Sequence, residues 1–152
     1  MSSTSASAFV DTNVLVYSFD SGEPVKRKRA QEVVERERER LVLSAQVLGE
    51  FYAVVTRKLE TPVSLEDALA AVRLWSRFRT VPLDGALVGA AIRISQTARI
   101  SYWDGLIVAA ARAAGCDRIL TEDLADGTAV EGVAIENPFA DAGASRRVRE
   151  FP

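Results

Sequence analysis

The chain of 152 residues contains no histidine, and this absence limits the chemistry that it can perform. Histidine is the commonest general base near neutral pH, the usual partner of a nucleophilic serine or cysteine, and a ligand in nearly every zinc enzyme. If the chain is an enzyme, its reaction must therefore depend on carboxylates, hydroxyls and a hard metal ion.

Cysteine and long apolar runs are also scarce. Cys116 is the only cysteine, so the chain can form neither an internal disulfide nor a cysteine zinc cluster, and a reducing cytoplasm fits best. No apolar run approaches the roughly 18 residues that cross a bilayer, so we expect no membrane partner. The first residues, MSSTSASA, lack the basic and apolar regions of a signal peptide, and we expect a flexible leader over 1–7.

Lysine is rare compared with arginine. Three lysines accompany sixteen arginines, while the formal net charge is only −2. If the acidic residues gather in one pocket, the remaining surface is relatively basic, which would suit a polyanion such as RNA. On charge alone, a solvated surface with salt bridges is the simpler interpretation.

The order of apolar patterns predicts one α/β domain over residues 8–139. The expected strands are short apolar runs at 8–10, 40–44, 80–83, 118–120 and 132–137. One helix is expected to begin near residue 14. Five further helices are expected over 24–40, 45–59, 65–78, 85–98 and 102–114. This alternation is typical of a mostly parallel sheet. The polar segment 140–152 is expected to be a tail.

Two acidic residues follow predicted strands. Asp11 comes directly after the strand at 8–10, and Asp123 lies shortly after the strand at 118–120. Ligands of parallel α/β sheets bind beyond the carboxyl ends of the strands. We therefore expect both carboxylates at the functional edge of the sheet.

Two further acidic residues fall on helices with a buried face. Glu50 lies three residues after Val47 and four before Val54, on or beside the apolar stripe of its helix. Asp104 precedes Ile107 and Val108 at the same helical spacing. Acidic side chains are almost never fully buried unless they are paired.

Each of these four acids also has a structural interpretation. Asp104 could form a capping box with Ser101, and Asp11 could cap the helix that follows it. Glu50 could pair with an arginine, and Asp123 could be an ordinary loop residue. If the four carboxylates converge instead, they repel each other, and they must either be protonated or bind a cation. A metal site whose ligands are all oxygen atoms favours Mg²⁺ or Mn²⁺.

Four segments together resemble the PIN domain family, most closely the VapC-type toxin ribonucleases of toxin–antitoxin pairs. These segments are FVDTNVL, LSAQVLGEF, ISYWDGLIVAAARAAGC and ILTEDLADG. The resemblance runs from about residue 8 to about residue 139. It implies an α/β/α sandwich around a mostly parallel sheet, a homodimer, RNA cleavage with one or two Mg²⁺ or Mn²⁺ ions, and inhibition by a cognate antitoxin protein.

The resemblance also assigns roles to residues of this chain. It implies four catalytic acids: Asp11, Glu50, Asp104 and Asp123. The three aspartates would bind the metal. The implied supporting polar residues are Thr12, Asn13, Thr121 and Ser44. Glu122 is assigned no role, because its side chain should diverge from that of its neighbour Asp123.

The resemblance thus implies a metal-dependent endoribonuclease, the toxin of a type II toxin–antitoxin pair, that cleaves RNA with a metal-activated water. One alternative is a PIN-like module that binds RNA or protein without cleaving. Another is an aspartate-based phosphatase or phosphoacceptor domain. The phosphatase would need a second aspartate at Asn13, and both would normally use a lysine late in the chain, but none follows Lys58. Arg27 and Arg29 could hold RNA phosphates, although a structural role is simpler.

Overall fold

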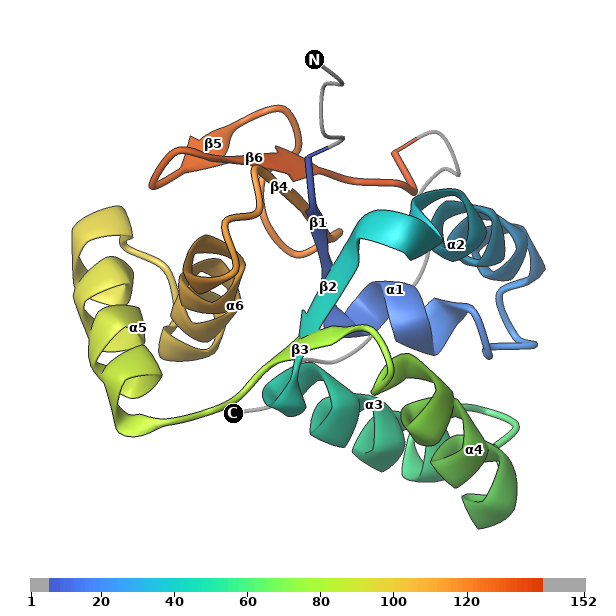
Figure 1. Ribbon diagram of the computed structural model, residues 1–152. Helices are drawn as coiled ribbons and strands as arrows, with labels where there is room; N and C mark the ends of the chain where they lie inside the picture. The colour runs from blue at the N-terminus through green and yellow to red at the C-terminus, as the bar shows by residue number, and fades with distance from the viewer. Residues whose placement is uncertain (1–5, 141–152) are drawn as a thin grey trace.

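A six-stranded sheet runs through the part of the chain that the computed structural model describes, residues 6–140 (Figure 1). The strand order is β3-β2-β1-β4-β6-β5, and all neighbours are parallel except β5 and β6. This confirms the predicted mostly parallel sheet. The strands are β1 (Ala8–Val10), β2 (Leu41–Ser44), β3 (Arg79–Val81), β4 (Arg118–Leu120), β5 (Ala129–Val130) and β6 (Val133–Glu136). Most of the predicted leader 1–7 and tail 140–152 lies outside the described residues.

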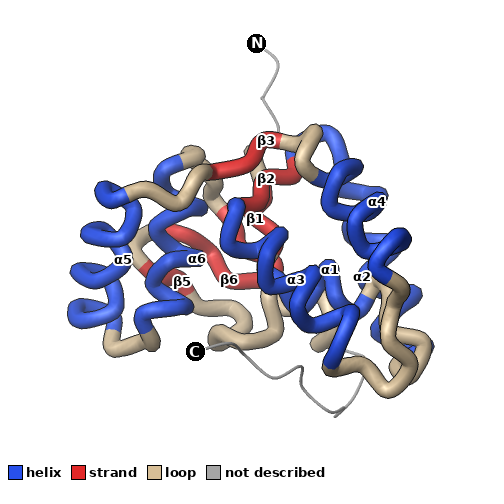
Figure 2. Tube along the Cα trace, turned by 90° about the horizontal axis from the view of Figure 1, so that it is seen from below, coloured by secondary structure: helices blue, strands red, loops and turns tan. Residues whose placement is uncertain are grey.

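Helices cover both faces of the sheet, as the α/β/α expectation requires. Figures 1 and 2 show α5 and α6 on one face and the other four α-helices on the opposite face. The helices are α1 (Thr12–Tyr17), α2 (Pro24–Glu37), α3 (Ala45–Arg57), α4 (Leu65–Trp75), α5 (Gly85–Ala98), α6 (Tyr102–Ala113) and the short 3₁₀ helix η1 (Arg38–Arg40). No helix within residues 6–140 is both long and apolar enough to cross a bilayer.

Side-chain caps explain where several helices begin. A serine or aspartate precedes each of α3 to α6, and its side-chain oxygen accepts the backbone N–H of the third residue after it. Such a bond satisfies one of the N–H groups that lack a partner at a helix start. The capping residues are Ser44, Ser64, Asp84 and Ser101.

Several predicted boundaries were wrong, and one strand was missed. The helix expected over 24–40 ends at Glu37 and continues as η1, and the helix expected over 65–78 ends at Trp75. Strand β5 was not predicted, because a strand of two residues is too short to show an alternation of apolar and polar side chains. It exists through antiparallel pairing with β6 across a turn in which Glu131 and Gly132 have φ values of 52° and 83°.

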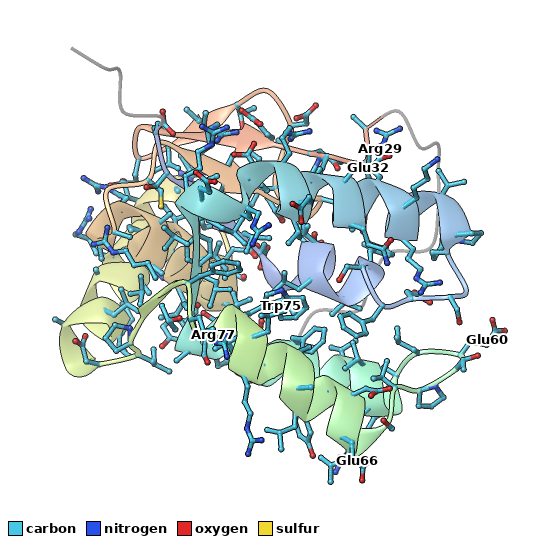
Figure 3. The ribbon with its side chains drawn as sticks, turned by 45° about the vertical axis from the view of Figure 1, so that its right-hand side comes forward. Arg29, Glu32, Glu60, Glu66, Trp75 and Arg77 are labelled. Atoms are coloured by element: carbon cyan, nitrogen blue, oxygen red, sulfur yellow. The ribbon has the colours of Figure 1, made fainter. Side chains whose placement is uncertain are left out.

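The helices on one face are joined by an aromatic cluster. Trp75 of α4, labelled in Figure 3, packs edge-on against Phe51 of α3 with ring centroids 4.6 Å apart. Phe19, which follows α1, contacts both rings at 5.4 and 5.8 Å. The cluster fixes α3 and α4 against α1, and so holds Glu50 of α3 beside the carboxyl end of β1.

Candidate active site

Sheet pairing brings the ends of β1 and β4 together. Val10 and Leu120 are register partners, so the next residues, Asp11 and Thr121, emerge side by side. The Thr121 hydroxyl donates to Asp11 Oδ2 at 2.8 Å. Asp11 Oδ1 accepts the Thr12 backbone N–H at 2.7 Å, and Asp11 is thereby the N-cap of α1. The capping alternative is therefore correct for Asp11. Its carboxylate also lies near those of Asp123 and Glu50, and these three acids are here called the acidic cluster.

The Asn13 side chain links the two aspartates of this edge. Its amide nitrogen donates to Asp123 Oδ2 at 2.9 Å and to Thr121 Oγ1 at 3.2 Å, and lies 3.5 Å from Asp11 Oδ2. Its amide oxygen accepts the Glu122 backbone N–H at 3.3 Å. Asn13, Thr121 and Asp123 thus form one network with Asp11.

Glu50 of α3 joins the network through a threonine. The Thr12 hydroxyl donates to Glu50 Oε1 at 2.7 Å, and Gln46 donates to Oε2 at 3.1 Å. Both carboxylate oxygens are therefore held in place. Sequence analysis missed Gln46, although its spacing of four residues from Glu50 on a helix was a usable signal.

Asp104 lies in the first turn of α6 and is half-buried. Its backbone N–H donates to the Ser101 hydroxyl at 3.0 Å, as the capping alternative expected. Helix α6 turns into β4 at Gly115, which has a φ of 73°, so the start of α6 lies toward the carboxyl ends of β4 and β1. Topology therefore puts Asp104 near the same carboxyl-terminal edge of the sheet as Asp11, although α6 and α1 cover opposite faces.

Gly105 sets how closely this helix approaches its neighbour. A Cβ atom at Gly105 would lie 2.6 Å from the backbone oxygen of Ala91 in α5, which is closer than real contacts allow. The glycine next to Asp104 therefore permits tight packing of α6 on α5, and this packing fixes the start of α6.

Ser44 lies at the carboxyl end of β2, next to β1 in the sheet. Its hydroxyl is buried and accepts the Val47 backbone N–H at 3.2 Å as the cap of α3. A supporting role for Ser44 in the site stays a prediction.

The acidic cluster is electrostatically costly as it stands. Burial raises the pKa of Asp11 well above its ordinary value, and the negative charges of Asp123 and Glu50 raise it further. Hydrogen bonds from Thr121 and Thr12 lower the pKa but do not cancel the effect. A cation at this edge would favour the ionised form of Asp11.

One known family matches most of the chain. The model of the PIN domain family matches residues 8–125. The chain belongs to the PIN domain family. No curated protein sequence matches this PIN domain closely enough to assign it further.

Several solved structures share its fold. VapC20 of Mycobacterium tuberculosis, described as a Sarcin-Ricin loop cleaving toxin, is 20% identical with a TM-score of 0.62, and the alignment covers 77% of this chain and 90% of that one. A toxin–antitoxin complex from Klebsiella pneumoniae is 17% identical, with a TM-score of 0.66 and coverage of 87% and 98%. DNA-bound VapBC from Salmonella typhimurium is 21% identical, with a TM-score of 0.62 and coverage of 88% and 99%.

The donor chemistry of this PIN domain fits a hard divalent cation. The cluster offers carboxylate, hydroxyl and amide oxygens and carries several negative charges, as Mg²⁺ and Mn²⁺ prefer. Within residues 6–140, no three acidic or thiol side chains already converge in a geometry that could hold an ion. A cation would therefore have to draw the carboxylates together and replace some hydrogen bonds from Asn13 and Thr121.

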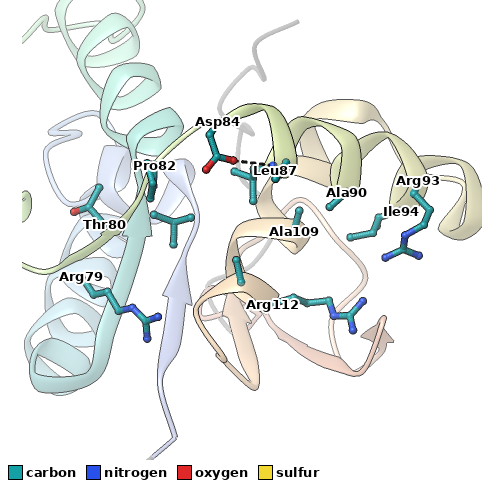
Figure 4. Close-up of a pocket in the computed structure, with 13 residues that line it drawn as sticks. Arg79, Thr80, Pro82, Asp84, Leu87, Ala90, Arg93, Ile94, Ala109 and Arg112 are labelled. Carbon is teal, nitrogen blue, oxygen red and sulfur yellow. Dashed lines mark hydrogen bonds between the residues drawn. The ribbon is translucent and has the colours of Figure 1, made fainter.

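A separate cavity of about 550 Å³ lies between β3, α5 and α6 (Figure 4). Arg79, Arg93 and Arg112 line it. Arg79 donates to the Ala114 backbone oxygen at 2.8 Å, and the other two pair with Glu131 at 3.5 and 2.6 Å. These guanidinium groups have partners within the fold, and none of the four candidate acids lines the cavity.

Proposed function

We propose that this PIN domain is a metal-dependent endoribonuclease and the toxin of a type II toxin–antitoxin pair. The observation that carries the proposal is the cluster at the carboxyl ends of β1 and β4. There Asp11 and Asp123 share one amide donor, and the pKa of Asp11 is raised by burial and by like charges. Neighbouring acids that raise the pKa of a buried aspartate in this way are suited to a cation.

The candidate ligands are Asp11, Asp104 and Asp123, with Glu50 as the fourth catalytic acid. A bound Mg²⁺ or Mn²⁺ would supply Lewis acidity toward water and the phosphodiester. Asn13 and Thr121 would orient the aspartates, since supporting hydrogen bonds fix the direction of ligand carboxylates.

Glu50 is suited to orient and deprotonate the attacking water. The Thr12 hydroxyl and the Gln46 amide hold its two oxygens at 2.7 and 3.1 Å, so the carboxylate keeps one orientation. Attack in line would form a bond from the water oxygen to phosphorus and break the bond to the leaving oxygen, which then takes up a proton.

The proposed partners follow from the family and from its structural neighbours. Neighbours with the same fold are described as toxin–antitoxin and VapBC complexes, which supports a cognate antitoxin encoded next to this chain. We propose that the protein acts in the cytoplasm as a homodimer on RNA. Co-expression with the product of an adjacent small reading frame, followed by co-purification, tests the antitoxin. Sedimentation of the purified toxin tests the dimer.

The central test is RNA cleavage by the purified protein. We expect degradation that depends on Mn²⁺ or Mg²⁺ and stops with EDTA, while a folded Asp104→Asn variant loses it. Full cleavage by that folded variant would contradict the assignment of Asp104. RNA binding without cleavage would favour the non-catalytic module, and formation of an acyl phosphate would favour the phosphoacceptor class.

A further inference from the structure

A buried ion pair lies directly behind the acidic cluster. Lys26 Nζ of α2 contacts Glu122 Oε1 at 2.8 Å, and the two side chains are only 4% and 5% exposed. The Tyr17 hydroxyl donates to the other oxygen, Glu122 Oε2, at 2.8 Å. As predicted from its position, the Glu122 side chain diverges from Asp123, but it does have partners.

Aromatic rings enclose the lysine. Lys26 Nζ lies 4.7 Å from the centre of the Tyr17 ring and 5.6 Å from that of Phe139. These two rings meet edge-on at 5.0 Å. Arg29, labelled in Figure 3, donates to the Pro138 backbone oxygen at 3.0 Å, which ties the segment before Phe139 to the same helix. The ammonium group is thus confined to one place.

Stability alone is a weak reason for such a pair. Removing two charges from water is costly, and apolar replacements of buried ion pairs are often as stable or more so. The position of this pair is more informative. The Glu122 backbone N–H donates to Asn13 Oδ1, and the amide nitrogen of Asn13 donates to Asp123 Oδ2. The contacts thus run from Lys26 through Glu122 and the Asn13 side chain to Asp123.

We propose that Lys26 and Glu122 are positioning residues for the proposed metal site, an inference that rests on the proposed function. Lys26 anchors the Glu122 side chain on one side of the chain, so the neighbouring Asp123 is directed to the opposite side. Thr121 reinforces this direction, because its hydroxyl oxygen accepts the Asp123 backbone N–H at 3.0 Å. The pair therefore holds residues 121–123 in the conformation that brings Asp123 to Asn13.

The test compares two buried ion pairs. The double variant Lys26→Met/Glu122→Met replaces the pair behind the cluster with apolar side chains. The control variant Glu37→Gln/Arg118→Met removes a buried pair near the amino ends of β2 and β4, where Arg118 Nη2 and Glu37 Oε1 lie 2.9 Å apart. Glu122→Gln is the milder second variant if the double variant does not fold, since it keeps the size of the side chain but removes the charge that pairs with Lys26.

Three measurements separate positioning from general stability. In metal-free protein, hydrogen exchange of the Glu122 and Asp123 backbone N–H groups is followed by NMR. Binding of Mn²⁺ is followed by electron paramagnetic resonance. The KM for RNA is measured at saturating Mn²⁺. We expect faster exchange at these two amides and Mn²⁺ binding weakened by about 10- to 100-fold, with KM nearly unchanged, whereas the control variant changes only the thermal midpoint.

Each outcome decides the inference. Wild-type exchange and wild-type Mn²⁺ binding in a folded double variant, or in Glu122→Gln, would overturn it. Lys26→Arg, which keeps the charge, should retain most of the Mn²⁺ affinity that the double variant loses. If wild-type protein binds Mn²⁺ but cuts no RNA, the proposed function fails, while the exchange and binding results still decide the role of the pair.

Discussion

Two buried acidic side chains lie at opposite ends of the parallel strands and behave in opposite ways. Asp11 follows the carboxyl end of β1, while Glu37 lies near the amino ends of β2 and β4; both residues are largely buried. Burial and like charges raise the pKa of Asp11. Hydrogen bonds from Arg118, the largest effect, together with Arg40 and Arg36, hold the pKa of Glu37 down at about 2.

Burial raises the pKa of both acids, but within residues 6–140 only Glu37 has cationic neighbours that oppose this effect. Glu37 Oε1 accepts from Arg118 and from Arg40, each at 2.9 Å, so its charge is neutralised within the chain. Within the described part of the chain, the donors to Asp11 are a hydroxyl, a backbone N–H and an amide, all of them neutral. A neutralised acid stabilises the fold, whereas an acid surrounded by like charges is available to a ligand cation.

The rate of RNA cleavage is expected to show the largest difference between variants of Asp11 and Glu37. Asp11→Asn should reduce RNA cleavage by about 1,000-fold, because it removes a ligand from a site that stabilises charge in the transition state. Glu37→Gln should leave the cleavage rate at 25 °C unchanged. Initial rates on a defined RNA at saturating Mn²⁺ check both. Equal rates for the two variants, each confirmed as folded by circular dichroism, would remove the functional side of the comparison.

The stability of the fold is expected to depend on the partners of Glu37. Arg118→Met leaves Glu37 buried with fewer positive partners, and we expect a loss of about 3 kcal/mol in the free energy of unfolding at pH 7. Urea unfolding measures this value. Adding Glu37→Gln in the same chain should recover part of the loss, because the uncompensated charge is then gone. If Arg118→Met alone is as stable as wild type, Arg36 and Arg40 are sufficient to compensate the charge of Glu37.

Acid should weaken the protein through Glu37. Its pKa is lowered from an ordinary 4.5 to about 2, so the unfolded state binds its proton first. The stabilisation is complete above about pH 4.5 and disappears as the pH falls toward 2. We expect a loss on the order of 2 kcal/mol across this window, measured by urea unfolding at several pH values. The Glu37→Gln variant should lose less of its free energy of unfolding over this pH range. If wild type and variant lose the same amount, the acid sensitivity does not come from Glu37.

The smallest expected effect is stabilisation by a divalent ion. At a Mn²⁺ concentration tenfold above its dissociation constant, a ligand that binds only the folded state stabilises it by about 1.4 kcal/mol. Thermal unfolding with and without Mn²⁺ should show this shift in wild type and in Glu37→Gln. The shift should be absent in Asp11→Asn, and an equal shift in all three would place Mn²⁺ elsewhere.

Local patterns were sufficient for most of the architecture. The helix over 85–98 was predicted with its observed bounds, because helical periodicity depends on residues within a few positions of each other. Strand β5 and the partners of Glu122 could not be predicted. Lys26 and Glu122 are 96 residues apart, and no local pattern indicates that they touch.

By itself, the sequence determined the kinds of element, the lack of histidine and the placement of acids beside buried faces. These properties follow from composition and from periods of two and 3.6 residues. The tertiary structure decided which acids meet and which are neutralised. Pairing of β1 with β4 brings Asp11 to Thr121 across 110 residues, while Glu37 receives Arg118 from 81 residues away. Whether a buried carboxylate is compensated depends on such distant neighbours, because electrostatic interactions act through space and not along the chain.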